Sequence, residues 1–116
     1  MNLKIRGNIP VKKNRQRIGK HGGIYKPAEV DAYEELVGWV ARIQKAEPVL
    51  GRFTISGVFK IRSTKDLDGV LTTILDSLQR HGLIENDRYL VGITNLTKET
   101  IPNKQEEYAD ITIEPA

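Results

Sequence analysis

The chain has 116 residues, of which 39% are hydrophobic and 28% are charged, and it contains no cysteine. This length fits one domain with a modest core. The lack of cysteine excludes disulfides, zinc–thiolate sites and thiol nucleophiles. No apolar run approaches the roughly 20 residues of a membrane-spanning helix, and the first residues lack the apolar stretch of a secretory signal. We therefore expect a cytoplasmic protein with no membrane partner.

The net charge of +3 is unevenly distributed. Residues 1–26 contain no Asp or Glu, and residues 7–26, here called the basic loop, are polar and long enough to predict a functional or disordered segment. Such a concentration of positive charge favours a polyanionic partner such as nucleic acid, although a solvated arm is the simpler alternative. The basic residues of this region are Lys4, Arg6, Lys12, Lys13, Arg15, Arg17, Lys20 and Lys26.

The first elements in chain order are a short strand, a helix and a longer strand. Residues 2–6 alternate between apolar and polar types, which predicts a strand. Between Pro27 and Pro48, apolar residues recur at steps of three and four, as they do on one face of an amphipathic helix. Residues 51–62 are rich in β-branched and aromatic types, which predicts a second strand with a bulge or a bend at Gly57.

A second helix and two further strands complete the chain. Residues 67–78 form an apolar stripe of helical period, and Gly82 is placed to end that helix. Residues 88–98 and 107–114 are predicted strands, which we expect to form a hairpin with each other. Residues 1–116 therefore predict a single small α+β domain, with a mixed β-sheet of about four strands and two main helices.

Two aspartates stand where the second strand passes into the second helix. In extended backbone the side chains at i and i+2 point the same way, so Asp66 and Asp68 can converge at this junction. Asp87 follows the helix. It could join the pair only if the strand after it lies beside residues 51–62 and brings Asp87 to the same end of the sheet.

Three convergent carboxylates would repel one another unless a cation lay between them. Mg²⁺, with Mn²⁺ as the alternative, prefers such oxygen ligands. A bound ion can activate water and stabilise charge on a phosphate. The alternative is structural: Asp66 or Asp68 caps the helix, which contributes about 1 kcal/mol, and Asp87 is a turn residue. The Asp-x-Asp spacing alone does not separate these interpretations.

Other polar residues offer weaker candidates. The two histidines are too few and too distant in sequence to predict a metal site or a catalytic triad. Four glutamates are expected on solvated faces: Glu34, Glu35, Glu106 and Glu107.

The order of these motifs resembles the RusA family of Holliday junction resolvases. The likeness rests on a basic residue before Asp-Leu-Asp, a helix with Leu-Asp-Ser-Leu, then Gly, two apolar residues and an acidic segment before a strand. The spacing from Asp68 to Asp87 agrees with the family, and the match covers nearly the whole chain. The segments that carry it are residues 9–15, 65–68, 74–78, 82–88 and 107–113.

The resemblance implies a homodimeric, Mg²⁺-dependent endonuclease from a bacterium or phage that cuts four-way DNA junctions in recombination and repair. It implies that Asp66, Asp68 and Asp87 are catalytic metal ligands, and that Lys65 contacts phosphate or stabilises the site. Two symmetric nicks suit a two-fold dimer. The basic loop is expected to follow the DNA backbone, with these contacts: Lys12, Lys13, Asn14, Arg15, Arg17 and Lys20.

Two positions depart from the family pattern. Gly69 stands where the family has Asn, and Thr72 stands where it has a Lys that can stabilise transition-state charge. Lys65, Lys60 or Lys98 could supply that charge from another direction. Otherwise the chain is a slow or inactive relative that still binds junctions. A third interpretation is an interaction module whose basic loop binds an acidic protein.

Overall fold

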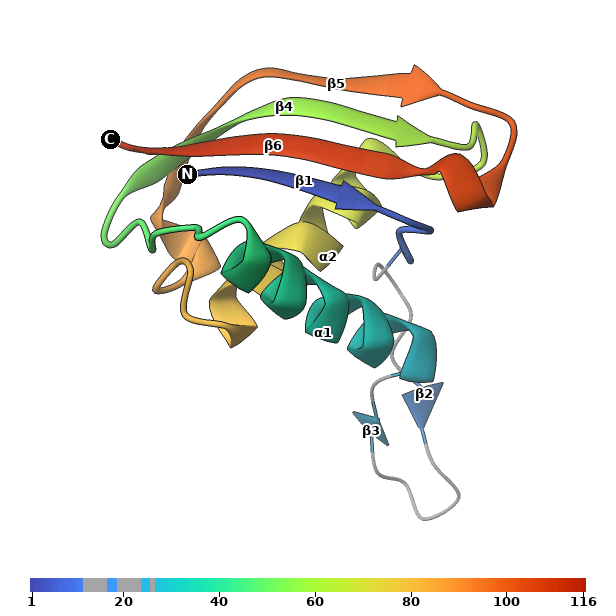
Figure 1. Ribbon diagram of the computed structural model, residues 1–116, viewed down its shortest axis with the longest axis horizontal. Helices are drawn as coiled ribbons and strands as arrows, with labels where there is room; N and C mark the ends of the chain where they lie inside the picture. The colour runs from blue at the N-terminus through green and yellow to red at the C-terminus, as the bar shows by residue number, and fades with distance from the viewer. Residues whose placement is uncertain (12–16, 19–23, 26) are drawn as a thin grey trace.

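The computed structural model describes residues 1–11, 17–18, 24–25 and 27–116, with backbone only at 17–18 and 24–25. Figure 1 shows two helices lying on one face of a sheet. The elements are β1 (Asn2–Arg6), β2 (Arg17–Ile18), β3 (Ile24–Tyr25), α1 (Ala28–Ile43), β4 (Phe53–Ile61), α2 (Leu67–Arg80), η1 (Asp87–Tyr89), β5 (Leu90–Thr100), η2 (Lys104–Glu106) and β6 (Tyr108–Pro115). The predicted small α+β domain with a four-stranded mixed sheet and two main helices is confirmed.

The main sheet has the order β1-β6-β4-β5. β4 and β5 are parallel and are connected through α2, whereas β6 runs antiparallel to both β1 and β4. Within the basic loop, β2 and β3 form a short antiparallel ladder of their own. β5 is therefore an edge strand of the main sheet, and β4 and β6 occupy its centre.

The predicted hairpin between the last two strands is wrong. β6 pairs with β4 and β1 instead of β5. The physical reason lies in the burial of the two strands: Ala109, Ile111 and Ile113 of β6 are fully buried, whereas β5 has no buried residue. A strand with one fully apolar face is stabilised in the middle of the sheet over the helices, and the more polar strand is left at the edge.

The core lies between the sheet and the two helices. Phe53 and Phe59 of β4 are fully buried, and each such side chain contributes about 1.5–3 kcal/mol relative to an exposed one. The register of β4 against β5 shifts between Ile55 and Gly57, but the extra residue lies in β5, since Ile55 pairs with Ile93 and Gly57 pairs with Leu96. Gly57 itself keeps a regular register against β6. In the described part of the chain, neither helix has the length and apolar character to cross a lipid bilayer.

Candidate functional site

The junction between β4 and α2 presents two exposed carboxylates. Asp66 occupies the N-cap position of α2 in extended backbone (φ −86°, ψ 139°), yet its side chain makes no capping hydrogen bond. Asp68 lies in the first helical turn, where its Oδ1 accepts the Gly69 N–H at 2.9 Å. The capping alternative thus leaves the Asp66 carboxylate unexplained, and both groups stand at the positive end of the α2 dipole.

Asp87 lies at the opposite end of α2. Its backbone N–H donates to the Gln79 side-chain oxygen at 3.0 Å, next to the last residue of the helix. The 13 residues from Asp66 to Gln79 span about 20 Å at the helical rise of 1.5 Å per residue. β5 does lie beside β4, as the sequence argument required, but the two strands run parallel with Phe53 opposite Leu90.

One protomer therefore brings Asp66 and Asp68 to one end of the sheet and Asp87 to the other. The expectation that all three meet within a single chain is not met by this geometry. Among the described residues, no group of three His, Cys, Asp or Glu side chains is placed to hold a metal ion. The Asp66–Asp68 pair offers hard oxygen donors suited to Mg²⁺, but it needs further ligands from outside the protomer or from solvent.

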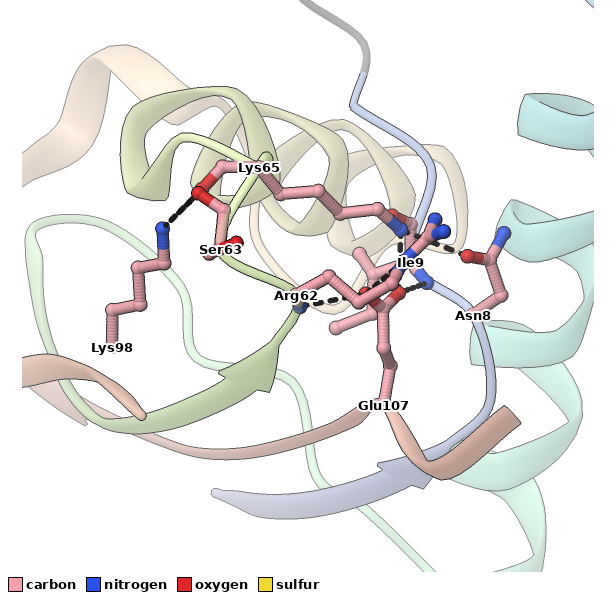
Figure 2. A network of polar contacts seen from close by, with 7 residues as sticks. All are labelled: Asn8, Ile9, Arg62, Ser63, Lys65, Lys98 and Glu107. Atoms are coloured by element: carbon pink, nitrogen blue, oxygen red, sulfur yellow. Dashed lines mark hydrogen bonds and ion pairs between the residues drawn. The ribbon is translucent and has the colours of Figure 1, made fainter. Parts of the chain in front are cut away.

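The resemblance implies that Lys65 contacts phosphate or stabilises the site. Lys65 as a whole residue is only 8% exposed. Its side chain extends toward Asn8 and Ile9 at the base of the basic loop, as Figure 2 shows. Its ammonium donates to Asn8 Oδ1 at 2.8 Å, to the Ile9 carbonyl at 2.6 Å and to Glu107 Oε1 at 2.5 Å. These three acceptors use all three ammonium hydrogens.

The expectation that Glu34 and Glu107 lie on solvated faces is wrong for both residues, because both are buried. Glu107 is the residue of this site that sequence reasoning missed. It is 1% exposed. Besides Lys65, its carboxylate accepts the N–H of Ile9 at 2.9 Å and of Arg62 at 3.0 Å. Glu107 is in phase with the buried alternation Ala109, Ile111 and Ile113, so extending that period by one step would have placed it on the buried face.

Opposing influences act on the pKa values of the buried pair. Burial raises the pKa of Glu107, but the hydrogen bonds from Lys65 and from the N–H groups of Arg62 and Ile9 outweigh it and leave that pKa below its ordinary value. Burial also dominates at Lys65 and lowers the pKa of its ammonium, against the opposing attraction of Glu107. Both directions follow from desolvation competing with a close partner.

Lys98 of β5 approaches the junction from the other side (Figure 2). Its Nζ donates to the Lys65 carbonyl at 2.6 Å and to the Ser63 carbonyl at 3.1 Å. The Lys65 carbonyl belongs to the peptide that leads directly into Asp66. A hollow of about 490 Å³ opens at the same end of the sheet, lined by Arg62, Ser63, Thr64, Thr100, Ile101 and Pro102.

Most of the expected DNA contacts fall outside the described residues, so their positions are not assigned. These are Lys12, Lys13, Asn14, Arg15 and Lys20. Arg17 begins β2, but its side chain also lies outside the described part.

The sequence model of the family described as Endodeoxyribonuclease RusA matches residues 8–114 of the chain. The chain belongs to the RusA family. Comparison with curated proteins returns no match. The family is one of DNA endonucleases, and its match includes the loop base, the Asp66–Asp68 junction, Asp87 and Glu107.

At the two positions that depart from the RusA pattern, the structure shows local backbone contacts. The Thr72 hydroxyl donates to the Asp68 carbonyl at 2.9 Å, one turn earlier in α2. Gly69 is buried, and its N–H holds the Asp68 carboxylate. Neither residue provides a positive charge. In the part of the chain that the structure describes, Lys98 of β5 brings an ammonium to the backbone of the junction.

Proposed function

We propose that this RusA-family chain is a Mg²⁺-dependent endonuclease, with Mn²⁺ as the alternative, that resolves four-way DNA junctions as a homodimer. The observation that carries the proposal is the pair of exposed aspartates at the start of α2, Asp66 and Asp68. The Asp66 side chain occupies the N-cap position but makes no capping hydrogen bond. Each active site would combine this pair with Asp87 of the partner subunit. The expected cell compartment is the cytoplasm of a bacterium, or of a host carrying phage genes.

The separation of Asp66 and Asp87 supports a site shared between two subunits. A two-fold axis perpendicular to α2 and β5 exchanges the ends of these elements, so it would bring Asp87 of the partner subunit toward the Asp66 end. β5 is one of the two edge strands of the main sheet. It exposes Val91 and Ile93, which are 46% and 55% exposed. An open edge with apolar side chains is a favourable surface for association.

The chemistry follows from the donor set. Asp66, Asp68 and the partner's Asp87 would hold the ion, and the ion would polarise the scissile phosphate and lower the pKa of an attacking water. Among the described residues, the Lys98 ammonium has two carbonyl acceptors for its three hydrogens, so one N–H would be left for a phosphate oxygen. Lys98 would then stabilise the charge for which Thr72 is unsuited.

Mixing two inactive variants tests the shared site. In a heterodimer of Asp66→Asn and Asp87→Asn, one site carries both substitutions and the other carries neither. We therefore expect a synthetic four-way junction with Mg²⁺ to be nicked by the mixture but by neither variant alone. A mixture of Asp66→Asn and Asp68→Asn is the control, because each of its two sites carries one substitution.

The outcomes separate the parts of the proposal. Nicking by wild type without rescue in the first mixture would place each site within one chain. The absence of nicking by wild type would remove the catalytic proposal. The hydroxyl at Thr72, in place of a cation, favours one alternative: a junction-binding protein with weak or no turnover. That alternative predicts salt-sensitive binding of branched DNA without cleavage.

A further inference from the structure

A buried polar cluster joins three segments that are far apart in sequence. These are residues 8–10 at the base of the basic loop, the β4–α2 junction at residues 62–65, and Glu107 before β6 (Figure 2). The cluster contains a buried charged pair, and desolvating two charges costs several kcal/mol of folding free energy. Apolar side chains of similar volume would avoid this penalty. The pair connects the loop base to the β4–α2 junction.

The carboxylate of Glu107 bridges the loop base and the junction with separate oxygens. Oε1 accepts the Ile9 N–H at 2.9 Å and the Lys65 ammonium. Oε2 accepts the Arg62 N–H at 3.0 Å, and Arg62 Nε lies 3.4 Å away. One side chain therefore fixes the backbone of the loop base relative to the strand that leads to Asp66.

The loop base is bonded to the same region by two further residues. Lys65 donates to the Ile9 carbonyl, so both backbone polar groups of Ile9 are bonded within the cluster. The Thr73 hydroxyl of α2 donates to the Pro10 carbonyl at 2.7 Å. The base of the basic loop is therefore hydrogen-bonded to the first half of α2, the helix that also carries Asp68.

We propose that Glu107 and Lys65 are positioning residues that fix the base of the basic loop relative to Asp66 and Asp68. This inference rests on the proposed function. The DNA strand bound by the loop is thereby aligned with the carboxylates, and loss of the bridge separates binding from cutting. The bound complex still forms through phosphate contacts, but the scissile phosphate is misplaced. A misplacement of about 1 Å can reduce the rate about 100-fold.

Glu107→Gln is the first variant, and Glu34→Gln is its matched control. The amide of Gln has one acceptor oxygen for the donors that the carboxylate now serves, so the bridge cannot be kept on both sides. Glu34 is as buried as Glu107 and is paired with Arg80 at 3.2 Å, at the far end of α2 from Asp66. Both variants remove one buried negative charge, but only Glu107→Gln affects the loop base.

Three measurements are made at a temperature where circular dichroism shows each variant to be folded. They are the Kd for a synthetic four-way junction, the single-turnover cleavage rate with Mg²⁺ at saturating protein, and hydrogen exchange of the peptide containing Ile9. For Glu107→Gln we expect unchanged Kd, about 100-fold slower cleavage and faster exchange. For Glu34→Gln we expect wild-type values of all three.

If Glu107→Gln does not fold, the double variant Lys65→Met with Glu107→Leu replaces it, because removal of a whole buried pair is tolerated better than removal of one partner. Wild-type cleavage by the folded variant would overturn the proposal, as would equal losses in Glu34→Gln. If wild type itself does not cut, the proposed function fails. Hydrogen exchange then still decides whether Glu107 holds the loop base.

Discussion

Lys65 and Glu107 stand 42 positions apart in the chain, and their charged groups lie 2.5 Å apart inside the protein. Both side chains are almost completely buried. Because each group compensates the other's lost hydration, the pair contributes to stability only while both are charged.

Acid should weaken the protein through Glu107. The pKa of its carboxyl is held below the ordinary 4.5 by Lys65 and two backbone N–H groups, despite the opposing effect of burial. This stabilisation is fully present above about pH 4.5 and is lost as the pH falls through the lower pKa of the folded state. We expect the urea unfolding free energy of wild type to fall more steeply below pH 4.5 than that of Glu107→Gln.

An exposed carboxylate provides the control for this pH dependence. Glu47→Gln alters an exposed residue between α1 and β4, away from the buried pair, and should keep the wild-type slope. A Glu107→Gln variant that also kept the wild-type slope would show that the buried pair does not dominate the acid sensitivity.

Gly57 should tolerate no side chain. Its φ is +134°, and a Cβ there would lie 2.0 Å from the Asp110 carbonyl oxygen of the adjacent β6. Gly57→Ala therefore adds a backbone clash in the centre of the sheet to a strain of about 1–3 kcal/mol. Gly51 is the matched control, since its φ is +74° but a Cβ would meet nothing within 4 Å. Gly51→Ala should cost only about 1–2 kcal/mol. Comparable urea midpoints for the two variants would contradict this assignment.

Much of the fold follows from the sequence because local periodicity governs it. The alternation at residues 2–6 and the helical stripe at 67–78 each predicted an element that the structure contains. Strand order did not follow, since the choice of β4 instead of β5 as the neighbour of β6 depends on burial compared across the whole sheet.

The candidate site was predictable in composition but not in arrangement. Asp66 and Asp68 lie at the same end of α2 because only two positions separate them in the chain. Asp87 lies elsewhere because the direction of β5 relative to β4 is a property of the topology. The burial of Lys65 could not be predicted from its local sequence, because a lysine can lie on the surface or in the core. What stabilises the buried ammonium is Glu107, a residue 42 positions away.

Removing the Tyr33 hydroxyl should stabilise the protein. This group is buried and has no hydrogen-bond partner among the described residues. Burial, and to a smaller extent the charge of Glu107, raises the pKa of Tyr33, so the hydroxyl stays neutral. A buried unsatisfied polar group costs about 1–3 kcal/mol, and we expect Tyr33→Phe to raise the unfolding free energy by about 1 kcal/mol. A loss of stability of Tyr33→Phe in urea denaturation would contradict this prediction.

Lys98 should be needed for cleavage more than for binding. Its ammonium donates to the Ser63 and Lys65 carbonyls, directly before Asp66 in the chain. In the proposed function, negative charge on the phosphate would develop near this position. Removing one such donor typically costs a factor of about 100–1,000 in rate. We expect Lys98→Met to reduce single-turnover cleavage of a four-way junction by about 100-fold.

The controls for Lys98 separate a local cation from general electrostatics. Lys104→Met removes the same charge from an exposed position in η2 and should leave the cleavage rate unchanged at saturating protein. Thr72→Lys places a cation one helical turn after Asp68 and should restore part of the rate to Lys98→Met, because it supplies charge near the same carboxylates. Equal losses in Lys98→Met and Lys104→Met would assign the effect to long-range attraction of DNA, which depends on salt.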